Sequence, residues 1–351
     1  MTTLDERVAA LFVAPAGRTA RPAAAIGAEL ELIPIRRATH SVVGIETSRD
    51  GAGTADVLRT VAHALQWTET PDAYGAPSWH LPVGGRISYE PGGQLEISSP
   101  VCDDAASLAR FLCETVSAVR DAAAESGLEL LALGVDPYNE MGAVPRVLFA
   151  PRYERMERYF DAIGPSGVRM MRQTASLQIN VELGDVPLLR WRLLNALAPY
   201  LTAAFASSRR YAGADSGYAS YRAHLWQTLD PSRTGLPYDE RDPIGAYARF
   251  AEHAGRILDD DAAHLTTLFP EVRPRGYFEL RSLDSMEPAR AKDALALVAA
   301  LLSSDDVTSE ALVVTGAPDA SLLPRAAREG YADPKLAKVF ERLERLAALV
   351  T

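Results

Sequence analysis

Hydrophobic and polar residues alternate along several short stretches of the chain, and this alternation predicts strands with one apolar face. In residues 25–35, alanine and leucines at every second position would face one side, while Glu29 and Glu31 would face the other. Residues 86–98 alternate in the same way on both sides of a Pro-Gly-Gly turn, which predicts a hairpin. Residues 172–183 and 276–284 complete the set of predicted alternating strands.

Between these stretches, apolar residues recur at helical spacing. The predicted helices span residues 4–12, 54–67, 152–163, 187–207 and 244–258, and most of the chain from residue 288 onward. A further long helix begins after a cap at Asp103 or Asp104 and runs through Glu125, and residues 128–135 form a buried strand. Because strands and helices do not alternate regularly, the predicted fold class is α+β. No repeat or linker divides the sequence, so we expect one domain over residues 1–351.

The composition is that of a folded protein with a sizeable core, since 48% of the 351 residues are hydrophobic and 23% are charged. The net charge of −10 argues against nucleic acid as a partner. No apolar run is long enough to cross a bilayer, and the first residues lack the basic segment of a signal peptide. Two cysteines do not make a disulfide framework, so we expect a cytoplasmic protein.

The lysines and histidines exclude two common kinds of site. None of the three lysines follows a glycine, so the Gly-Lys-Ser/Thr ending of a Walker-type phosphate loop is absent. The six histidines show no metal-ligand spacing, which argues against zinc. A nucleotide would therefore have to bind in another way.

Glutamate dominates the polar faces of the predicted strands. The residues on these faces are Glu29, Glu31, Glu90, Gln94, Glu96, Gln178, Asn180, Glu279 and Arg281. A sheet with one solvated face is the simpler interpretation of any single strand. Like charges side by side in a sheet are destabilising, however, and a divalent cation would reverse that cost. Because Mg²⁺ and Mn²⁺ prefer oxygen ligands, and Arg281 beside Glu279 suits a phosphoryl oxygen, we predict an acidic face that binds magnesium and a nucleotide.

Five segments resemble the plant and actinobacterial type of glutamate–cysteine ligase, and they occur in that family's order between about residues 25 and 285. EPGGQLEIS resembles the family's Pro-Gly-Gly-Gln-Leu-Glu signature, and GAELEL stands where the family carries Glu-x-Glu. MRQTASLQINVEL resembles its Met-Arg and Gln-x-Asn strand. LWQTLDPSRTG and HLTTLFPEVRPRGYFELRSLD are similar to the actinobacterial branch that makes γ-glutamylcysteine for ergothioneine.

The resemblance implies a glutamine-synthetase-like fold, in which a curved, mainly antiparallel sheet has an acidic concave face and is backed by helices. It also implies that ATP activates the γ-carboxylate of glutamate as an acyl phosphate, which an amine, such as that of cysteine, then attacks. ATP and Mg²⁺, or Mn²⁺, would be the cofactors, and small-molecule substrates would be the partners.

The resemblance also implies roles for individual residues. The metal ligands would be Glu29, Glu31, Glu90, Glu96, Gln178 and Glu279. Catalytic roles are implied for Glu31 and for Arg281, which would contact the transferring phosphoryl group. The nucleotide would be bound by Gln178, Asn180 and Arg281, and the substrates by Arg172, Tyr218 and Arg222.

Residues 206–218 depart from the family pattern. Where the family has Ala-Asn-Ser-Pro, this chain reads ASSRRYAGADSGY, and Ala214 followed by Asp215 replaces an arginine of the family. Because this loop binds substrate in the family, the acceptor amine stays open. A ligase of a specialised pathway, joining glutamate or another acid to a different amine, is one alternative. A non-catalytic homologue that binds nucleotide or amino acid is the other, although a site without function has no need of costly clustered carboxylates.

Overall fold

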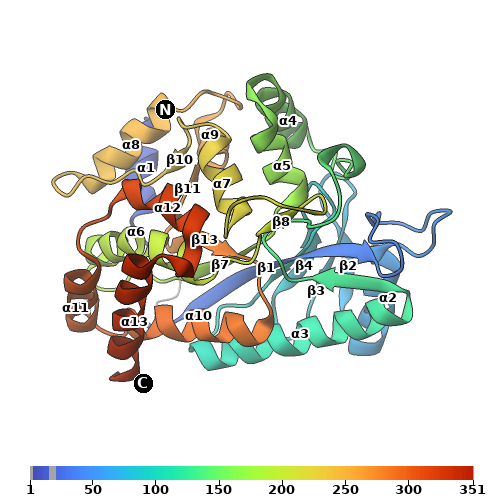
Figure 1. The fold of residues 1–351 in the computed structure, drawn as a ribbon, viewed down its shortest axis with the longest axis horizontal. Coiled ribbons are helices and arrows are strands. Elements are labelled where there is room, and N and C mark those ends of the chain that lie inside the picture. Colours follow the sequence, from blue (N-terminus) through green and yellow to red (C-terminus); the bar gives the residue numbers. More distant parts are fainter. Residues whose placement is uncertain (1–2, 16–20, 351) are drawn as a thin grey trace.

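The protein is built around β1 (Ile26–Arg36), the strand that carries Glu29 and Glu31. The computed structural model describes residues 3–15 and 21–350. Within this part of the chain, β1 lies in a nine-stranded sheet with the order β12-β13-β7-β1-β5-β4-β3-β2, and β6 pairs with β1 as well (Figure 1). Neighbouring strands of this sheet run antiparallel throughout.

The other strands of this sheet are shorter than β1. They are β2 (Thr68–Pro71), β3 (Pro77–His80), β4 (Arg86–Tyr89), β5 (Leu95–Ser98), β6 (Leu128–Leu131), β7 (Ser176–Val181), β12 (Val272–Pro274) and β13 (Phe278–Asp284). Two small ladders lie outside it, formed by β8 (Arg210–Tyr211) with β9 (Ala214–Asp215) and by β10 (Thr234–Gly235) with β11 (Phe269–Pro270).

Helices fill most of the remaining chain. The α-helices are α1 (Leu4–Leu11), α2 (Thr54–Leu65), α3 (Ala105–Glu125), α4 (Pro151–Ile163), α5 (Pro165–Gln173), α6 (Pro187–Ala204), α7 (Tyr221–Thr228), α8 (Pro243–His253), α9 (Asp261–Leu265), α10 (Pro288–Leu301), α11 (Asp305–Thr315), α12 (Leu323–Glu329) and α13 (Pro334–Ala348). Short 3₁₀ turns occur at η1 (Met141–Ala143), η2 (Ala320–Leu322) and η3 (Gly330–Ala332). None of the helices in the described residues combines the length and the apolar character that a membrane span requires.

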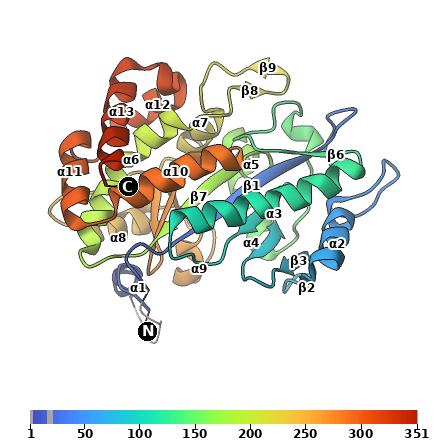
Figure 2. The same cartoon turned by 90° about the horizontal axis from the view of Figure 1, so that it is seen from below.

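The two faces of the large sheet have different cover. On one face, Leu30 and Leu32 of β1 and Leu177 and Ile179 of β7 are completely buried in a hydrophobic core shared with α3, α6 and α10. Figures 1 and 2 show α3 and α10 running side by side across this face. On the opposite side, α4, α5 and α7 stand over the polar face (Figure 1). The apolar half of each alternating strand therefore anchors the sheet, and the polar half faces a space between strands and helices.

The register of the strands brings the acidic residues together. Glu31 on β1 lies opposite Glu96 on β5, and Glu29 lies opposite Gln178 on β7. Residues that are directly opposed in antiparallel strands have Cβ atoms about 4.5–5.5 Å apart. Polar side chains from three adjacent strands thus share one small area of the sheet.

Several predicted elements are confirmed. Strands β4 and β5 form the predicted hairpin. Asp104 caps α3, and its side chain accepts a hydrogen bond from the backbone N–H of Ser107 at 2.7 Å. The strand predicted over residues 128–135 is shorter than expected, because β6 ends at Leu131.

The strand predicted over residues 172–183 is wrong in its first part. Helix α5 extends through Gln173, and β7 begins only at Ser176. Val168 and Met171, three positions apart, are buried in a small core, and this helical periodicity prevails over the polar alternation that follows it. Arg172 therefore lies in the last turn of a helix and not on the strand that carries Gln178.

Gly92, in the turn between β4 and β5, lies against the end of α5. A Cβ atom at position 92 would be 1.9 Å from the carbonyl oxygen of Arg172, which is far inside van der Waals contact. We predict that Gly92→Ala lowers the free energy of unfolding, measured by urea denaturation, by about 2–3 kcal/mol because the two segments must move apart. Gly142 is the control, since an added Cβ there meets no atom within 4 Å. Equal stability of Gly92→Ala and Gly142→Ala would contradict the close approach.

Candidate active site

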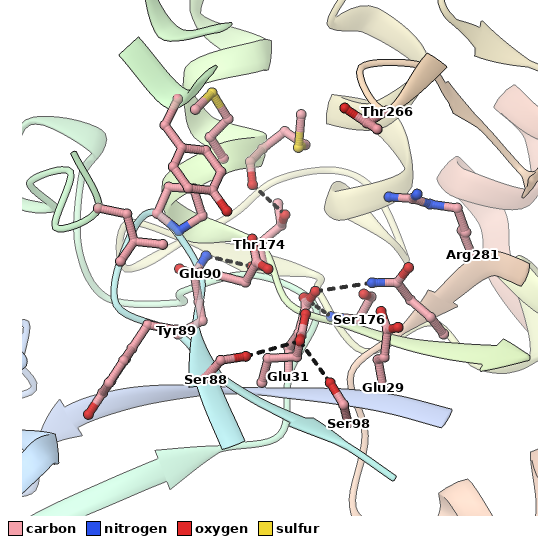
Figure 3. A pocket seen from close by; sticks show the side chains of 18 of the residues that line it. Glu29, Glu31, Ser88, Tyr89, Glu90, Ser98, Thr174, Ser176, Thr266 and Arg281 are labelled. Carbon is pink, nitrogen blue, oxygen red and sulfur yellow. Dashed lines mark hydrogen bonds between the residues drawn. The ribbon is translucent and has the colours of Figure 1, made fainter. Parts of the chain in front are cut away.

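A cavity of about 420 Å³, the first or acidic cavity, lies between the polar face of the sheet and helices α4, α5 and α7 (Figure 3). Many of the predicted site residues line it, namely Glu29, Glu31, Glu90, Glu96, Gln178, Arg222 and Arg281. The sheet supplies the carboxylates and the amide, while α7 supplies Arg222 and β13 supplies Arg281. The structure thus brings together residues that are up to 252 positions apart in the sequence, as the pair Glu29 and Arg281 illustrates.

Glu31, Glu90 and Glu96 form a group of carboxylates at the floor of this cavity. Each offers one oxygen atom, and the three oxygens lie within 4.8 Å of one another. Glu31 comes from β1, Glu96 from the adjacent β5, and Glu90 directly follows β4, so the pairing of three antiparallel strands creates the group. Three carboxylates at this spacing can bind one divalent cation.

Burial and mutual repulsion raise the pKa values of three carboxyl groups in the cavity. Burial, followed by the charge of Glu96, raises the pKa of Glu31 to about 7. The same two causes raise the pKa of Glu29 to about 8, and the pKa of Glu90 rises well above its ordinary value. Because a bound cation would offset the repulsion, the donor set fits a divalent metal ion chemically.

Hydrogen bonds orient two of these carboxylates. The backbone N–H of Ser176 donates to Glu31 Oε2 at 2.7 Å. The hydroxyl groups of Ser88 and Ser98 donate to Glu96 Oε1 at 3.2 and 2.9 Å. Figure 3 shows Ser88, Ser98 and Ser176 around the acidic residues. Each donor comes from a strand of the sheet, so the backbone geometry fixes where the carboxylate oxygens point.

Gln178 and Glu29 extend the group of oxygen ligands toward β7. Gln178 Nε2 donates to Glu31 Oε1 at 3.3 Å. Its Oε1 atom is buried and has no hydrogen-bond partner among the described residues. Leaving a buried carbonyl oxygen unsatisfied is costly, and a cation between Gln178 and the opposed Glu29 would satisfy it. The two side chains could therefore hold a metal ion of their own.

Glu279 lies outside the lining of the cavity and is surrounded by arginines. Its carboxylate accepts hydrogen bonds from Arg273 at 2.6 and 3.0 Å, from Arg275 at 3.2 Å and from Arg281 at 3.0 Å. Burial acts to raise the pKa of Glu279, but the Arg273 and Arg281 guanidinium groups hold it down at about 2. The predicted metal role of Glu279 has no support in these contacts, which instead show how the arginines are held.

Arg281 and Arg222 present two guanidinium groups to the cavity beside Trp226. Their central carbon atoms lie 5.1 and 4.9 Å from the centre of the Trp226 ring, within the range of cation–π contacts. Arg222 Nη2 also donates to the carbonyl oxygen of Arg281 at 2.9 Å. Burial, followed by the charge of Arg273, lowers the pKa of Arg281 to about 10, so this side chain stays charged at neutral pH. These two positively charged guanidinium groups, next to the carboxylates, can bind a phosphoryl group or a carboxylate.

Two predicted substrate-binding residues do not line the cavity. Arg172 forms an ion pair with Glu157 and donates to the carbonyl oxygen of Val144 at 3.3 Å. Tyr218 stacks on His224 with ring centroids 4.0 Å apart. The structure therefore does not bring Arg172 and Tyr218 together with the acidic residues.

Asn180 lines a second cavity of about 400 Å³, which adjoins the first because Glu29 lines both. Besides Glu29 and Asn180, the second cavity is lined by small and apolar residues with a tyrosine, and by further charged and polar residues at its border: Pro15, Ala25, Gly27, Val101, Val181 and Tyr277, with Arg21, Ser99, Glu182 and Arg275. Asn180 Oδ1 is buried and has no hydrogen-bond partner among the described residues. The second cavity therefore offers a polar acceptor beside apolar side chains, next to a carboxylate of the first cavity.

The expectation that residues 206–218 shape the substrate pocket is not supported, because none of them lines either cavity. Part of this segment forms the β8–β9 hairpin, where Arg209 and Asp215 make an exposed ion pair at 2.8 Å. Asp215 consequently adds no charge to the lining of the acidic cavity. The departure from the family pattern thus gives no reason to exclude an amino acid as the acceptor.

Other lining residues escaped the prediction. Trp226 and Arg273 both line the acidic cavity. Both lie within segments that carry the family resemblance, so that resemblance was a signal that could have found them. Arg152, at the start of α4, lines the cavity as well. No sequence signal marks it, because α4 reaches the cavity only through tertiary packing.

A family model described as glutamate–cysteine ligase family 2 matches residues 25–349. The chain belongs to this family. The glutamate–cysteine ligase EgtA of Mycolicibacterium smegmatis is 35% identical over 306 residues, which cover 76% of this chain and 71% of that protein. The EgtA of Mycobacterium tuberculosis is 32% identical, covering 83% of this chain and 78% of its own length. The predicted family membership is confirmed.

A solved structure supports the fold as well. A 2.0 Å crystal structure of glutamate–cysteine ligase from Francisella tularensis, in complex with AMP, has a TM-score of 0.55 to this chain. It is 14% identical in sequence, and the match covers 93% of this chain and 78% of that one. The predicted fold, an α+β arrangement with a mainly antiparallel sheet backed by helices, is confirmed.

The raised pKa of Glu31 predicts how this side chain affects the stability of the metal-free protein. The folded state keeps the proton on Glu31 up to about pH 7, whereas the ordinary pKa is 4.5. Between pH 4.5 and pH 7 the folded state binds more protons than the unfolded state. The contribution of Glu31 to the free energy of unfolding therefore falls as the pH rises. Burial lowers the pKa values of His224 and His264, so these two groups make the free energy of unfolding rise with pH. The effect of Glu31 is therefore measured as a difference from a variant that lacks its carboxyl group.

We expect the melting temperature of the wild type minus that of Glu31→Gln, both in EDTA, to decrease between about pH 5 and pH 8. Differential scanning calorimetry across this range measures it. Glu114→Gln, on the exposed side of α3, is the matched control and should differ from the wild type by a constant amount. A difference for Glu31→Gln that stays constant or grows with pH would refute the assigned environment of Glu31.

Proposed function

We propose that this protein is an ATP-dependent carboxylate–amine ligase that joins the γ-carboxylate of glutamate to the amine of cysteine. The observation that carries the proposal is the buried group of Glu31, Glu90 and Glu96 beside the paired guanidinium groups of Arg222 and Arg281. Buried like charges are unfavourable unless a cation joins them, and phosphoryl transfer requires charge neutralisation of this kind. The names of the related ligases agree with this reaction.

The residues present fit Mg²⁺ or Mn²⁺. Glu31, Glu90 and Glu96 would hold one ion, and Glu29 with Gln178 would hold another. When bound, the metal ions would neutralise charge on the phosphate oxygens of ATP and on the acyl phosphate. The unpaired Oε1 of Gln178 supports this assignment, because the structure offers that atom no other partner among the described residues.

We assign the phosphoryl group to Arg281 and a substrate carboxylate to Arg222. In the first step an oxygen of the γ-carboxylate attacks the γ-phosphorus of ATP, and the bond to the bridging oxygen of ADP breaks. In the second step the neutral amine attacks the acyl carbon, the bond to phosphate breaks, and the amine nitrogen gives up one proton to the departing phosphate. The guanidinium of Arg281, held by Glu279 and stacked on Trp226, would stabilise the charge that develops in both steps.

The second cavity is our proposed site for the nucleoside of ATP. It adjoins the acidic cavity at Glu29, so the phosphates would cross from one cavity to the other beside the proposed metal ligands. The apolar part of its lining suits a purine ring, and the buried Oδ1 of Asn180 can accept a hydrogen bond from an amino group on that ring. In this proposal Asn180 has the nucleotide-binding role that the family resemblance implies.

Cysteine is the acceptor that we favour, because the segment that cast doubt on it lies outside both cavities. Arg152 lines the acidic cavity and could bind an α-carboxylate, whereas Arg86, which also lines it, is ion-paired with Glu96 at 3.8 Å. A ligase for a different amine and a non-catalytic homologue are the alternatives. We place the reaction in the cytoplasm, where ATP and free thiols are available, and the two free cysteines of the chain agree with a reducing environment.

A coupled assay for ADP release, with mass spectrometry of the product, tests the proposal. Wild-type protein with ATP, Mg²⁺, glutamate and cysteine should release ADP and form γ-glutamylcysteine. Glu96→Gln should lower kcat by about a hundredfold or more, because it removes a metal ligand and leaves the fold in place. Glu114→Gln, which exchanges an exposed glutamate on α3, should behave like the wild type.

Three outcomes distinguish the alternatives. If ADP release requires glutamate but is faster with another amine than with cysteine, that amine is the acceptor. Absence of ADP release with any pair of acid and amine would overturn the ligase proposal in favour of a binding protein. Full activity of Glu96→Gln at ordinary magnesium concentration would contradict the assignment of the metal site.

A further inference from the structure

Gln94 is a buried glutamine in the short turn between two of the acidic residues, Glu90 and Glu96. Only 2% of its surface is exposed. Although it lines the acidic cavity, both ends of its amide are already engaged. Its Oε1 accepts a hydrogen bond from the backbone N–H of Gly92 at 3.0 Å, and its Nε2 donates to the carbonyl oxygen of Thr174 at 2.7 Å. This amide is therefore not free to bind a metal ion or a substrate.

The two hydrogen bonds connect parts of the chain that are 80 residues apart. Gly92 belongs to the turn that carries Glu90, and the backbone of this turn is closed by bonds between Glu90 and Gln94 at 2.9 Å and between Gly93 and Glu90 at 2.9 Å. Thr174 belongs to the joint between α5 and β7. Among the described residues, the Gln94 side chain provides the hydrogen bond between the turn at 90–94 and the joint at 172–176.

The joint also holds the third carboxylate of the acidic group. Two residues after Thr174, the backbone N–H of Ser176 donates to Glu31 Oε2 at 2.7 Å. The hydroxyl of Thr174 closes the end of α5 by donating to the carbonyl oxygen of Met170 at 2.7 Å, so the joint is itself fixed. A rigid path therefore runs from the turn that carries Glu90, through Gln94 and Thr174, to Ser176 and Glu31.

We propose that Gln94 is a positioning residue that sets the distance of Glu90 from Glu31, whereas the pairing of β1 with β5 sets that of Glu96. The inference rests on the proposed function in one respect, namely that these three carboxylates bind a divalent cation. Gln94 would act through the placement of the ligands and would not touch the cation. Residues that orient metal ligands in this way typically change metal affinity by about 10–100-fold when they are altered.

The chemistry of the position explains why it carries glutamine. A glutamate would keep the acceptor for Gly92 but would turn a carboxylate oxygen toward the Thr174 carbonyl oxygen, and two acceptors repel each other. A methionine would keep the length of the side chain and lose both bonds. Only a side chain with one donor and one acceptor at its tip satisfies both backbone groups at once.

Titration of the nucleotide-free protein with Mn²⁺, followed by the electron paramagnetic resonance signal of free Mn²⁺, tests this role without depending on catalysis. We expect Gln94→Glu and Gln94→Met to weaken Mn²⁺ binding by about tenfold or more. Hydrogen exchange of the metal-free protein, read by mass spectrometry, should show faster exchange in both variants in peptides that cover residues 86–98 and 172–180.

Gln227→Glu is the matched control. Gln227 Nε2 also donates to a backbone carbonyl, that of Leu323 at 3.1 Å, but this residue does not line the acidic cavity. The control should lose a comparable hydrogen bond and bind Mn²⁺ like the wild type.

The outcomes separate this inference from the proposed function. If wild type and both folded Gln94 variants bind Mn²⁺ equally well, the positioning role is wrong while the metal site stands. If Gln227→Glu weakens Mn²⁺ binding as much as the Gln94 variants do, the effect is general destabilisation and the inference fails. If the wild type binds no Mn²⁺ with glutamates 31, 90 and 96 intact, the metal site of the proposed function fails and this inference falls with it.

Discussion

The electrostatic repulsion among buried glutamates is the constraint on which the rest of this structure depends. Glu31 and Glu96 are directly opposed across two antiparallel strands. Glu90 is close enough to bind the same metal ion as these two residues. An arrangement of this kind is unfavourable in isolation. The apolar face of the same strands, packed on α3 and α10, supplies the burial that holds the backbone in place despite this cost.

Arginines neutralise Glu279 far more than the acidic group of Glu31, Glu90 and Glu96, where the contact is a single ion pair of Arg86 with Glu96 at 3.8 Å among the described residues. Glu279 gathers Arg273, Arg275 and Arg281, so its charge is compensated within the protein. Glu31 makes no ion pair with an arginine in the described part of the chain, and burial raises its pKa to about 7. This asymmetry divides the site into a part that can bind cations and a part that can bind anions. A substrate with phosphates and a metal ion needs both.

The sequence predicted the acidic face because a strand has a period of two residues. The alternation in residues 25–35 correctly placed Glu29 and Glu31 on one side of β1, and the Pro-Gly-Gly turn correctly predicted the hairpin that carries Glu90 and Glu96. Arg172 was misplaced because the end of a helix and the start of a strand can carry the same local alternation, and only packing decides between them. The roles of Arg172 and Tyr218 as substrate contacts stay predictions without support from the geometry.

Other features of the site depend on tertiary structure that local patterns do not encode. The compensation of Glu279 requires Arg273 from the neighbouring β12, and the double hydrogen bond of Gln94 requires a joint 80 residues away. Gln178 and Asn180, two residues apart on β7, line different cavities. Alternation gives the face on which a residue lies, but not the cavity into which it points.

Anomalous diffraction from crystals grown with Mn²⁺ and a non-hydrolysable ATP analogue would test most directly whether the acidic face is a metal and nucleotide site. The account predicts a manganese peak within about 2–2.5 Å of carboxylate oxygens from Glu31, Glu90 and Glu96. It also predicts that the phosphates of the analogue lie between this peak and Arg281. Bound analogue with no manganese among these three glutamates would contradict the account.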